Sequence, residues 1–349
     1  MADCFCKRGA MSDQARITNQ KDGSSFVQAA GDSILRAALR AGLGLAYECN
    51  SGGCGGCKFE LLDGEVEGLW PEAPGLSERD RRRGRHLACQ CRALGDIIIA
   101  APSAGEYVPV IRPRRRAAKL AGVRDITHDL REFRFLSFEG AAFLPGQYAM
   151  LDLPGLTASR AYSMSNTTNE RGEWHFQIRR VPHGQGTHTL FDRLHVGDEI
   201  GLDGPYGVAN LRTDSPRDIV CVAGGSGLAP MISIARGASE AGMLAERTLY
   251  FFYGARTPRD VCGDDMLRAL PGFGERIRFI PVVSLPGEDG QWSGATGYVH
   301  DRLEQVLPAR MADYEFYFAG PPPMTQAVQE LLMIGHQVPF AQIHFDRFF

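Results

Sequence analysis

The sequence is poor in several features that would have narrowed its class at once. It has no run of 18 apolar residues, and its first residues, MADCFCKRGAMSDQ, have no apolar core of a signal peptide. We therefore expect a cytoplasmic protein without a membrane span. The formal net charge is only −3, so nucleic acid is not expected as the main partner. The Arg-rich runs at 81–85 and 112–116 are local, and most such runs are solvated surface.

A chain of 349 residues is too long for one ordinary core and predicts two or three domains. Its hydrophobic share of 44% and charged share of 23% are typical of a globular protein. The nine cysteines are not expected to form a disulfide framework, because the cytoplasm keeps thiols reduced. At least four of them therefore need another explanation.

Cys49, Cys54 and Cys57 have the spacing C-x4-C-x2-C, and Cys89 follows in LACQC. This is the plant-type spacing for a 2Fe-2S cluster. Four thiolates must converge on two irons, while backbone N–H groups offset the negative charge of the cluster. The glycines between the cysteines allow the backbone to come close and to take positive φ angles.

Two alternatives remain open for this motif. A structural zinc site normally takes two C-x2-4-C knuckles, whereas here the far end offers Cys89 and Cys91, one residue apart. Cys91 is also an alternative fourth ligand of the cluster, although we expect it to be a spare thiol. The cluster held by Cys49, Cys54, Cys57 and Cys89 is the favoured interpretation.

The flanking segments predict a small mixed domain. Asp32 or Ser33 is expected to cap a helix over ILRAALRAG, which ends at the glycine-bearing AGLG. KFELLDGEVEGL, at 58–69, predicts a hairpin, and DIIIAAP, at 96–102, predicts a closing strand. We therefore expect a small ferredoxin-like domain over 13–103.

The middle of the chain predicts an antiparallel barrel over 113–213. After the linker EYVPVIRPRRRAAKL come short strand candidates with Gly and Pro punctuation: LREFRFLSF, QYAMLDL, EWHFQIRRV and DEIGLDGPYG. In RAYSMSN, at 160–166, a strand would put Arg160, Tyr162 and Met164 on one face. A ring and a cation could then contact one bound molecule, although an ordinary exposed strand explains the pattern equally well.

The last third, 214–349, predicts a doubly wound parallel sheet. DIVCVAGGSGLAPMISIARGA is an apolar strand, a glycine loop and a helix, an order that places backbone N–H groups beside a phosphate. GGSG is not the full dinucleotide fingerprint. TLYFFYGAR, IRFIPVVSL and EFYFAGPPPM are further apolar runs, and three of these segments end in glycine-bearing turns. Ligands of such sheets bind at the carboxyl ends of the strands, so a nucleotide site is expected there.

Taken together, these motifs resemble the reductase components of bacterial multicomponent oxygenases. YECNSGGCGGCK, LACQC, PGQY, RAYSMSN, GPYG, AGGSGLAP, YGAR, GPPPM and IHFDRFF occur in the order found in that family. The likeness covers nearly the whole chain and is closest to toluene-type and xylene-type monooxygenase reductases. It implies a β-grasp ferredoxin domain, an FAD-binding β-barrel and an NAD-binding α/β domain.

The resemblance also implies roles at the flavin. Arg160 would bind the FAD pyrophosphate, Tyr162 would lie against the isoalloxazine and Ser163 would donate a hydrogen bond near flavin N5. Ile178 and Arg179 would contact the adenine side, and Gly186 and Thr187 the phosphates. Phe348 or Phe349 would cover the flavin, with Phe348 the better match. We expect Tyr162, Ser163 and Phe348 to be the residues that act at the flavin.

At the nicotinamide nucleotide, the resemblance implies contacts from Gly224, Gly225, Ser226, Gly227, Gly320 and Pro321. Arg256 and Asp260 are expected at the adenosine end. Asp260 would accept from a ribose hydroxyl and repel a 2′-phosphate, which favours NADH, whereas Arg256 argues weakly for NADPH. The family usually has Cys-Gly-Pro-Pro where this chain has Ala319, Gly320 and Pro321. We expect hydride transfer to persist with altered geometry or rate.

Electron counting predicts the mechanism. A nicotinamide gives two electrons as hydride and a 2Fe-2S cluster accepts one, so the flavin must stand between them. The predicted path is NADH to FAD to the 2Fe-2S cluster to an external acceptor, a Rieske-type ferredoxin or a diiron hydroxylase of a hydrocarbon monooxygenase. As a hypothesis, the basic run at 81–85 steers that acceptor.

Two other functions remain as alternatives. One is the reductase of a ring-hydroxylating dioxygenase, and the other is an iron–sulfur redox sensor or binding module. The flavin and nucleotide motifs argue against the sensor. Of the remaining cysteines, Cys221 is expected in the core, Cys262 is expected to have no partner, and Cys4 and Cys6 precede the first domain. Trp70, Trp174 and Trp292 are expected to serve in packing.

Overall fold

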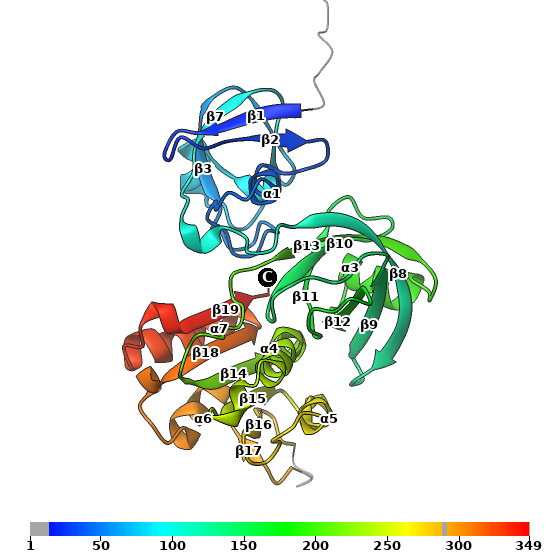
Figure 1. The fold of residues 1–349 in the computed structure, drawn as a ribbon, viewed down its shortest axis with the longest axis vertical. Coiled ribbons are helices and arrows are strands. Elements are labelled where there is room, and N and C mark those ends of the chain that lie inside the picture. The colour runs from blue at the N-terminus through cyan, green and yellow to red at the C-terminus, as the bar shows by residue number, and fades with distance from the viewer. Residues whose placement is uncertain (1–13, 288–291, 349) are drawn as a thin grey trace, which may run out of the picture. The chain divides into compact units, whose positions relative to one another are not determined.

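The computed structural model describes residues 14–287 and 292–348. Contacts divide the chain into two compact units, Met1–Pro113 and Arg114–Phe349 (Figure 1). The second unit contains both the barrel and the parallel sheet, which we had predicted as two domains. The predicted boundaries near 103, 213 and 214 stay predictions.

The first unit is built on a five-stranded sheet with the order β2-β1-β7-β3-β5, in which β1 and β7 are parallel. A separate pair joins β4 to β6. The strands are β1 (Gln14–Asn19), β2 (Ser25–Ala29), β3 (Lys58–Asp63), β4 (Val66–Gly68), β5 (Arg85–Leu87), β6 (Cys91–Ala93) and β7 (Ile97–Ala100). This mixed sheet with a packed helix confirms the predicted ferredoxin-like fold.

Helix α1 (Ile34–Arg40) begins where its sequence predicts. The Ser33 hydroxyl accepts a hydrogen bond from the Arg36 N–H at 3.3 Å, so Ser33 rather than Asp32 is the cap. Ile34, Leu35 and Leu39 are fully buried. The helix therefore covers the core of the first unit with one apolar face.

The predicted hairpin over 58–69 was wrong. β3 pairs with β5 and β7, and β4 pairs with β6, so the two neighbouring strands do not pair with each other. β7 contributes buried Ile97 and Ile99, whereas the three residues of β4 are exposed or half-buried. Burial against the more apolar β7 decided the partner of β3, which local alternation alone does not reveal.

The second unit begins with a six-stranded antiparallel sheet in the order β11-β10-β13-β8-β9-β12. A bridge between Met164 and Phe176 links the two ends of that order and closes the barrel. Its core includes Phe133, Phe135 and Trp174. The strands are β8 (Arg114–Asp125), β9 (Leu130–Ser137), β10 (Tyr148–Asp152), β11 (Arg160–Ser163), β12 (Glu173–Arg179) and β13 (Glu199–Tyr206).

A six-stranded parallel sheet follows, in the order β17-β16-β15-β14-β18-β19. The order reverses at β14, because β15 lies on one side of it and β18 on the other. Ligands of doubly wound sheets bind at such a reversal. The strands are β14 (Asp218–Gly224), β15 (Leu249–Ala255), β16 (Ile277–Val283), β17 (Ala295–Thr296), β18 (Tyr314–Gly320) and β19 (Ile343–Arg347).

Helix α4 (Leu228–Glu240) joins the barrel to this sheet. Its Ser233 hydroxyl donates to the Asn166 carbonyl at 2.7 Å, and Arg236 Nη1 donates to the Ser165 carbonyl at 2.7 Å. These two carbonyls end the segment RAYSMSN. The helix that begins at the glycine loop is thus fastened to the strand predicted to hold the flavin. The other helices of this unit are α3 (Gln185–His188), α5 (Asp264–Arg268), α6 (Val299–Val306) and α7 (Pro322–Glu330).

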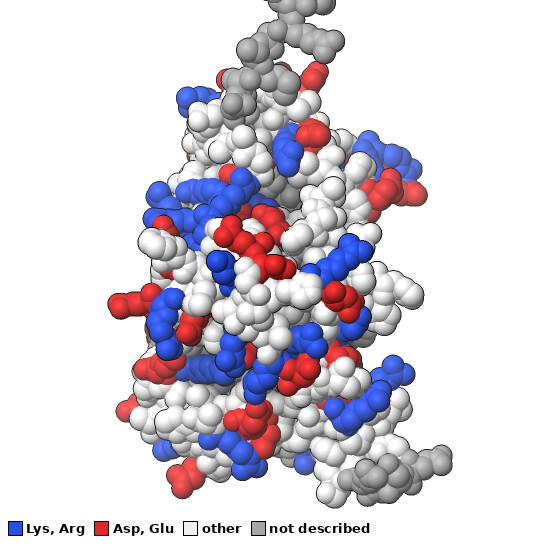
Figure 2. Space-filling model, turned by 90° about the vertical axis from the view of Figure 1, so that its right-hand side faces the viewer, with Lys and Arg blue, Asp and Glu red and all other residues white. Residues whose placement is uncertain are grey.

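The surface has no single dominant charge. Figure 2 shows basic and acidic side chains in small neighbouring groups on the face drawn, in line with the net charge of −3. Within the described ranges, no helix combines the length and hydropathy needed to cross a bilayer.

Candidate functional site

The cysteine loop directs backbone donors at its own sulfur atoms. The N–H groups of Ser51 and Cys54 donate to Cys49 Sγ at 3.5 and 3.4 Å, and the Gly56 N–H donates to Cys54 Sγ at 3.3 Å. Such donors stabilise thiolates and lower the cost of placing negative charge in the loop.

The four predicted ligands lie together as two neighbouring pairs. The neighbouring Cys54 thiol, together with Ser51, lowers the pKa of Cys49 to about 5. The Cys57 thiol, together with burial, raises the pKa of Cys89, and the charges of Cys49 and Cys54 act in the same direction. Cys89 therefore lies within electrostatic reach of the other three sulfurs.

Cys91 lies to one side of this group. Burial raises the pKa of Cys91 to about 12, and of the four predicted ligands only Cys57 contributes to that rise. Cys91 belongs to β6, whose backbone pairs with Gly68 of β4. The geometry thus favours Cys89 over Cys91 as the fourth thiol of the loop.

The loop has the shape that a cluster requires. Gly52 and Gly55 have φ angles of 90° and 77°, and a Cβ at Gly55 would lie 2.5 Å from the Gly75 carbonyl oxygen. Asn50 is 1% exposed, and its Nδ2 has no hydrogen-bond partner among the described residues. A buried donor, converging thiols and inward N–H groups fit a 2Fe-2S group.

In the barrel, β11 brings Arg160 and Tyr162 against the predicted phosphate turn. A Cβ at Gly186 would lie 3.1 Å from Tyr162 Oη and 3.2 Å from Arg160 Cγ. Burial raises the pKa of Tyr162 to about 12, so the phenol stays protonated. Glycine at 186 lets the 184–187 turn approach this Arg-Tyr pair closely, and the resulting surface fits a flavin nucleotide.

The other residues predicted to contact the flavin differ in the groups that they can offer to a ligand. Ser163 is 6% exposed, and its hydroxyl has no hydrogen-bond partner among the described residues. The Thr187 hydroxyl instead donates within its own turn, to the carbonyls of Val181 and Gly184 at 3.2 and 3.1 Å. Ile178 is 1% exposed and lies in the barrel core, so it can offer only its backbone. Met164 also lies in that core, and Tyr162 packs against the same core.

Two glycine-bearing turns meet where the strand order reverses. A Cβ at Gly227 would lie 1.9 Å from the Ala319 carbonyl oxygen, and one at Gly224 would lie 2.6 Å from Met324 Sδ. Gly320 has a φ of 149° and lies against Gly224, and Pro321 precedes α7. Glycine is required here because the turn after β14 and the turn after β18 pack backbone against backbone. Ser226 between them is half-buried.

Asp260 already has partners within the protein. Its Oδ2 accepts from the Thr257 N–H at 2.9 Å and from the Thr257 hydroxyl at 2.7 Å, so it caps the turn after β15. Burial alone would raise the pKa of Asp260, but the Thr257 hydrogen bonds and the Arg179 charge hold it below the usual value. Asp260 Oδ2 therefore stabilises its own turn, while Oδ1 faces Arg179, and the predicted contact with a ribose stays a prediction. Arg256 in the same turn is exposed.

Arg179 joins the two predicted nucleotide regions. Its Nε donates to Asp129 at 2.6 Å, and its Nη2 lies 3.6 Å from Asp260. A Cβ at Gly225 would lie 3.3 Å from Arg179 Nη1. His128, Asp129 and Asp260 lie close enough to hold a metal ion, but the guanidinium already compensates the two carboxylates. Arg179 was predicted to contact the adenine side of the flavin. It also lies beside the glycine loop predicted to bind the nicotinamide nucleotide.

Sequence reasoning missed part of this network. Cys262 Sγ donates to Tyr253 Oη at 3.2 Å, and Tyr253 Oη donates to the Gly225 carbonyl at 3.4 Å. Cys262 therefore has a partner, contrary to our expectation. Asp129 is far from Tyr253 and Cys262 in the sequence, and Tyr253 lies in an apolar strand, so no local pattern indicated this network. Cys221 lies in the core as expected, and Cys4 and Cys6 lie outside the described residues.

The chain end returns to the same region. β19 pairs in parallel with β18, and the Phe348 N–H donates to the Gly320 carbonyl at 3.2 Å. The Phe348 ring packs partly against the core of the parallel sheet. Phe348 is thus held at the turn that also contains Ala319, which is 0% exposed. Phe349 lies outside the described residues.

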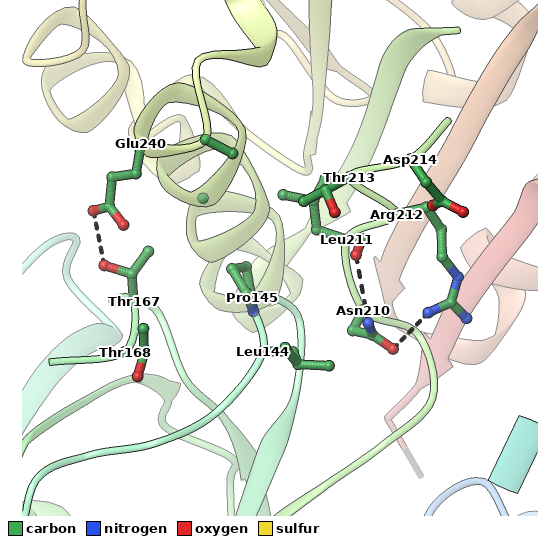
Figure 3. A pocket seen from close by; sticks show the side chains of 12 residues that line it. Leu144, Pro145, Thr167, Thr168, Asn210, Leu211, Arg212, Thr213, Asp214 and Glu240 are labelled. Atoms are coloured by element: carbon green, nitrogen blue, oxygen red, sulfur yellow. Dashed lines mark hydrogen bonds between the residues drawn. The ribbon is translucent and has the colours of Figure 1, made fainter. Parts of the chain in front are cut away.

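A cavity of about 510 Å³ lies elsewhere in this unit (Figure 3). It lies between barrel loops and the carboxyl end of α4, whereas the glycine loop lies at the amino end of that helix. Two pairs among its polar side chains are already satisfied, Thr167 with Glu240 and Arg212 with Asn210, each at 2.8 Å. The cavity is therefore separate from the nucleotide turns.

Comparisons with known proteins agree with this layout. Residues 17–94 match a 2Fe-2S iron-sulfur cluster binding domain, 117–211 an oxidoreductase FAD-binding domain and 221–330 an oxidoreductase NAD-binding domain. The fold and its sites thus define an oxidoreductase with iron–sulfur, flavin and nicotinamide-nucleotide domains.

The relatives define the family more narrowly. The chain is 41% identical to the ferredoxin–NAD(P)+ reductase CarAd of Metapseudomonas resinovorans, over 96% of this chain and 99% of the relative. It is 40% identical to the ferredoxin–NAD+ reductase component of the alkene monooxygenase system of Xanthobacter autotrophicus, over 94% and 98%. The xylene/toluene monooxygenase electron transfer component XylA of Pseudomonas putida is 33% identical over 96% and 95%.

A solved structure has a fold similar to that of this chain. The ferredoxin reductase in carbazole 1,9a-dioxygenase superposes with a TM-score of 0.88 at 37% identity, covering 96% of this chain and 98% of that chain. The chain belongs to the family of ferredoxin–NAD(P)+ reductases with a 2Fe-2S domain.

Proposed function

We propose that this protein passes electrons from NADH to the protein acceptor of an oxygenase system that oxidises aromatic or alkene hydrocarbons. The observation that supports this most is the convergence of the four cysteine sulfurs in a chain that also has FAD-binding and NAD-binding domains. A redox sensor would not need the two nucleotide sites. In such a protein FAD accepts a hydride and releases electrons singly to the iron–sulfur cluster.

The cluster ligands in this proposal are Cys49, Cys54, Cys57 and Cys89. The protein alone brings their sulfurs close together. The N–H groups of Ser51, Cys54 and Gly56 point at the sulfurs of Cys49 and Cys54. Burial of Cys57 and Cys89 excludes water from one side of the site. These groups would hold the cluster and tune its potential.

For the flavin, the proposal assigns binding to Arg160, Tyr162 and the turn with Gly186 and Thr187. Ser163 offers a nearly buried hydroxyl without a protein partner, which suits a hydrogen bond to a ligand. Ile178 would contribute backbone only. Phe348, held by the Gly320 carbonyl, is the aromatic residue assigned to cover the flavin.

For the nicotinamide nucleotide, the proposal assigns Gly224, Gly225, Ser226, Gly227, Gly320 and Pro321 to the reacting end. Arg179 beside Gly225 offers a cation near the expected pyrophosphate. Arg179, 3.6 Å from the Asp260 carboxylate, weakens the argument for NADH from that residue. NADH stays the proposed donor because the alkene monooxygenase relative, 40% identical, is named for NAD+.

The acceptor is proposed to be a Rieske-type ferredoxin or a diiron hydroxylase of a monooxygenase. The reductase component of a ring-hydroxylating dioxygenase is a second candidate, favoured by the structural match to the carbazole dioxygenase reductase. Supplying NADH and the purified reductase to ferredoxins and hydroxylases from both kinds of system decides between them. Selective reduction of monooxygenase acceptors supports the first, and selective reduction of a dioxygenase ferredoxin supports the second.

A further inference from the structure

The segment 69–76 covers one side of the cysteine loop. The Gly75 N–H donates to the Gly52 carbonyl at 2.9 Å, and the Leu69 N–H donates to the carbonyl of Gln90, which lies between Cys89 and Cys91, at 2.8 Å. A Cβ at Gly52 would lie 3.1 Å from Trp70 Cε3. Backbone hydrogen bonds therefore hold the indole of Trp70 directly against the loop that would hold the cluster.

Trp70 and Leu69 are unusually exposed for their size. Their exposed fractions are 46% and 40%, whereas Trp174 is 0% exposed and donates to the Ser137 hydroxyl. Trp70 therefore packs against the cysteine loop with one face and leaves the other face exposed. An indole held on one face and open to solvent on the other is suited to contact with a partner, since tryptophan is enriched at binding hot spots.

Arginines border this apolar pair. Helix α2 (Glu78–Arg82) leaves four arginines exposed at its surface and just beyond it: Arg79, Arg81, Arg82 and Arg83. Arg81 Nη2 donates to the Ala73 carbonyl at 3.3 Å, which fixes the helix to segment 69–76. The Asp80 carboxylate does not offset them, because it is buried and bound to Ser77 and Lys58.

The structure narrows the basic run proposed from the sequence. Arg85 is half-buried and is bound to Asp80 and Glu60, each at 3.3 Å, so it stabilises the unit. The exposed arginines of the run are Arg81, Arg82 and Arg83, and exposed Arg79 lies beside them. Their positive charge, beside exposed apolar side chains, is complementary to a partner with an acidic rim around an apolar patch.

We propose that Trp70, Leu69 and the exposed arginines at 79–83 form the docking surface for an acidic iron–sulfur acceptor protein. This inference rests on the proposed function. The arginines accelerate encounter with the acceptor, and Trp70 fills an apolar recess on it beside the cysteine loop. Redox complexes need only a small contact, so one aromatic anchor has a large effect on affinity.

The test uses the full-length protein and a purified acidic Rieske-type ferredoxin, with ferricyanide as a small acceptor that needs no docking surface. Trp70→Ala is expected to raise the ferredoxin concentration for half-maximal rate by about tenfold. Flavin reduction by NADH and ferricyanide reduction stay unchanged. Val27→Ala is the matched control. Val27 is 45% exposed on β2, an edge strand of the five-stranded sheet in the same unit.

Charge is tested separately. Arg82→Gln combined with Arg83→Gln is expected to slow ferredoxin reduction at low salt and to flatten its dependence on salt. With basic cytochrome c as acceptor, the same change is expected to speed reduction. Equal salt dependence in the variant and the wild type contradicts the charge part of the proposal.

The remaining outcomes separate a failure of the docking proposal from a failure of the proposed function. Wild-type ferredoxin kinetics in Trp70→Ala overturn the docking proposal, as does a slower transfer from flavin to cluster with unchanged ferredoxin kinetics. If Trp70→Ala loses the cluster absorption, Leu69→Ala gives the deciding measurement. A wild-type protein in which NADH bleaches neither chromophore contradicts the proposed function instead.

Discussion

Cys89 and Cys91 lie two residues apart and are both buried, but only Cys89 is influenced by all three sulfurs of the loop. Cys89→Ser is therefore expected to lose the iron, the acid-labile sulfide and the visible absorption of the cluster. Cys91→Ser, the matched control, is expected to keep all three. Loss of the cluster in Cys91→Ser with retention in Cys89→Ser would exchange their roles.

Among the described residues of RAYSMSN and the 184–187 turn, Ser163 has a predicted flavin-side hydroxyl that protein groups leave unsatisfied, unlike Ser165 and Thr187. Ser163→Ala is expected to slow flavin reduction by NADH by about tenfold or more, since a lost ligand hydrogen bond costs of the order of 1–2 kcal/mol. Anaerobic stopped-flow measurement at matched flavin content checks this. A wild-type rate would remove Ser163 from the site.

Single residues also show where sequence reasoning reached its limit. The cysteines and the glycines at 52, 224 and 227 were predictable because few residue types satisfy a thiolate site or a backbone-to-backbone contact. Cys262 was misread, and the contacts of Asp260 and Trp70 were not foreseen, because the partners Tyr253, Arg179 and Gly52 are set by tertiary packing. No spacing in the sequence encodes those distances.

At the scale of elements, the turn after β15 separates two side chains that sequence reasoning treated together. Asp260 is bound to Thr257 and faces Arg179, whereas the Arg256 side chain is exposed. A 2′-phosphate at this turn would meet Arg256, and Asp260 would not repel it strongly, because Arg179 already compensates that carboxylate.

We therefore expect Asp260→Asn to lower the unfolding temperature but to leave the ratio of kcat/KM for NADH and NADPH within about twofold. Arg256→Ala is expected to reduce kcat/KM for NADPH more than for NADH. Steady-state kinetics with both nucleotides checks both variants. A large change of preference in Asp260→Asn would restore its original role.

The strands themselves were easier to predict than their pairing. The apolar runs of β14, β15, β16 and β18 are continuous because both faces of the parallel sheet are covered, and each was recognised. The β3–β4 hairpin failed because short, polar β4 has little apolar surface to offer β3. Pairing depends on which distant strand buries more, which local alternation does not report.

At the scale of the whole molecule, a buried charge cluster links β18, β19 and the chain before β14. Glu315 is 3% exposed and accepts from His344 at 2.7 Å, from Ser215 at 2.8 Å and from Arg217 at 3.1 Å. Burial alone would raise the pKa of Glu315, but these partners hold it below its ordinary value of 4.5.

Because that pKa is depressed in the folded state, the ionised Glu315 stabilises the fold above pH 4.5 and loses this effect as the pH falls through the folded value. Glu315→Gln is expected to lower the free energy of unfolding by about 1.5–3 kcal/mol at pH 7, with a difference that shrinks in acid. Thermal unfolding across pH checks this against Glu246→Gln, an exposed control. A difference independent of pH would contradict the assignment.

The central claim is that one chain takes hydride from NADH and releases single electrons through a cluster at its cysteine loop. Anaerobic titration of the reconstituted protein with NADH, followed by visible absorption, tests it most directly. We expect NADH to bleach both the flavin and the 2Fe-2S bands. About 1.5 NADH per chain are needed, because FAD takes two electrons and the cluster takes one. Bleaching of the flavin alone, or absence of either chromophore after reconstitution, would contradict it.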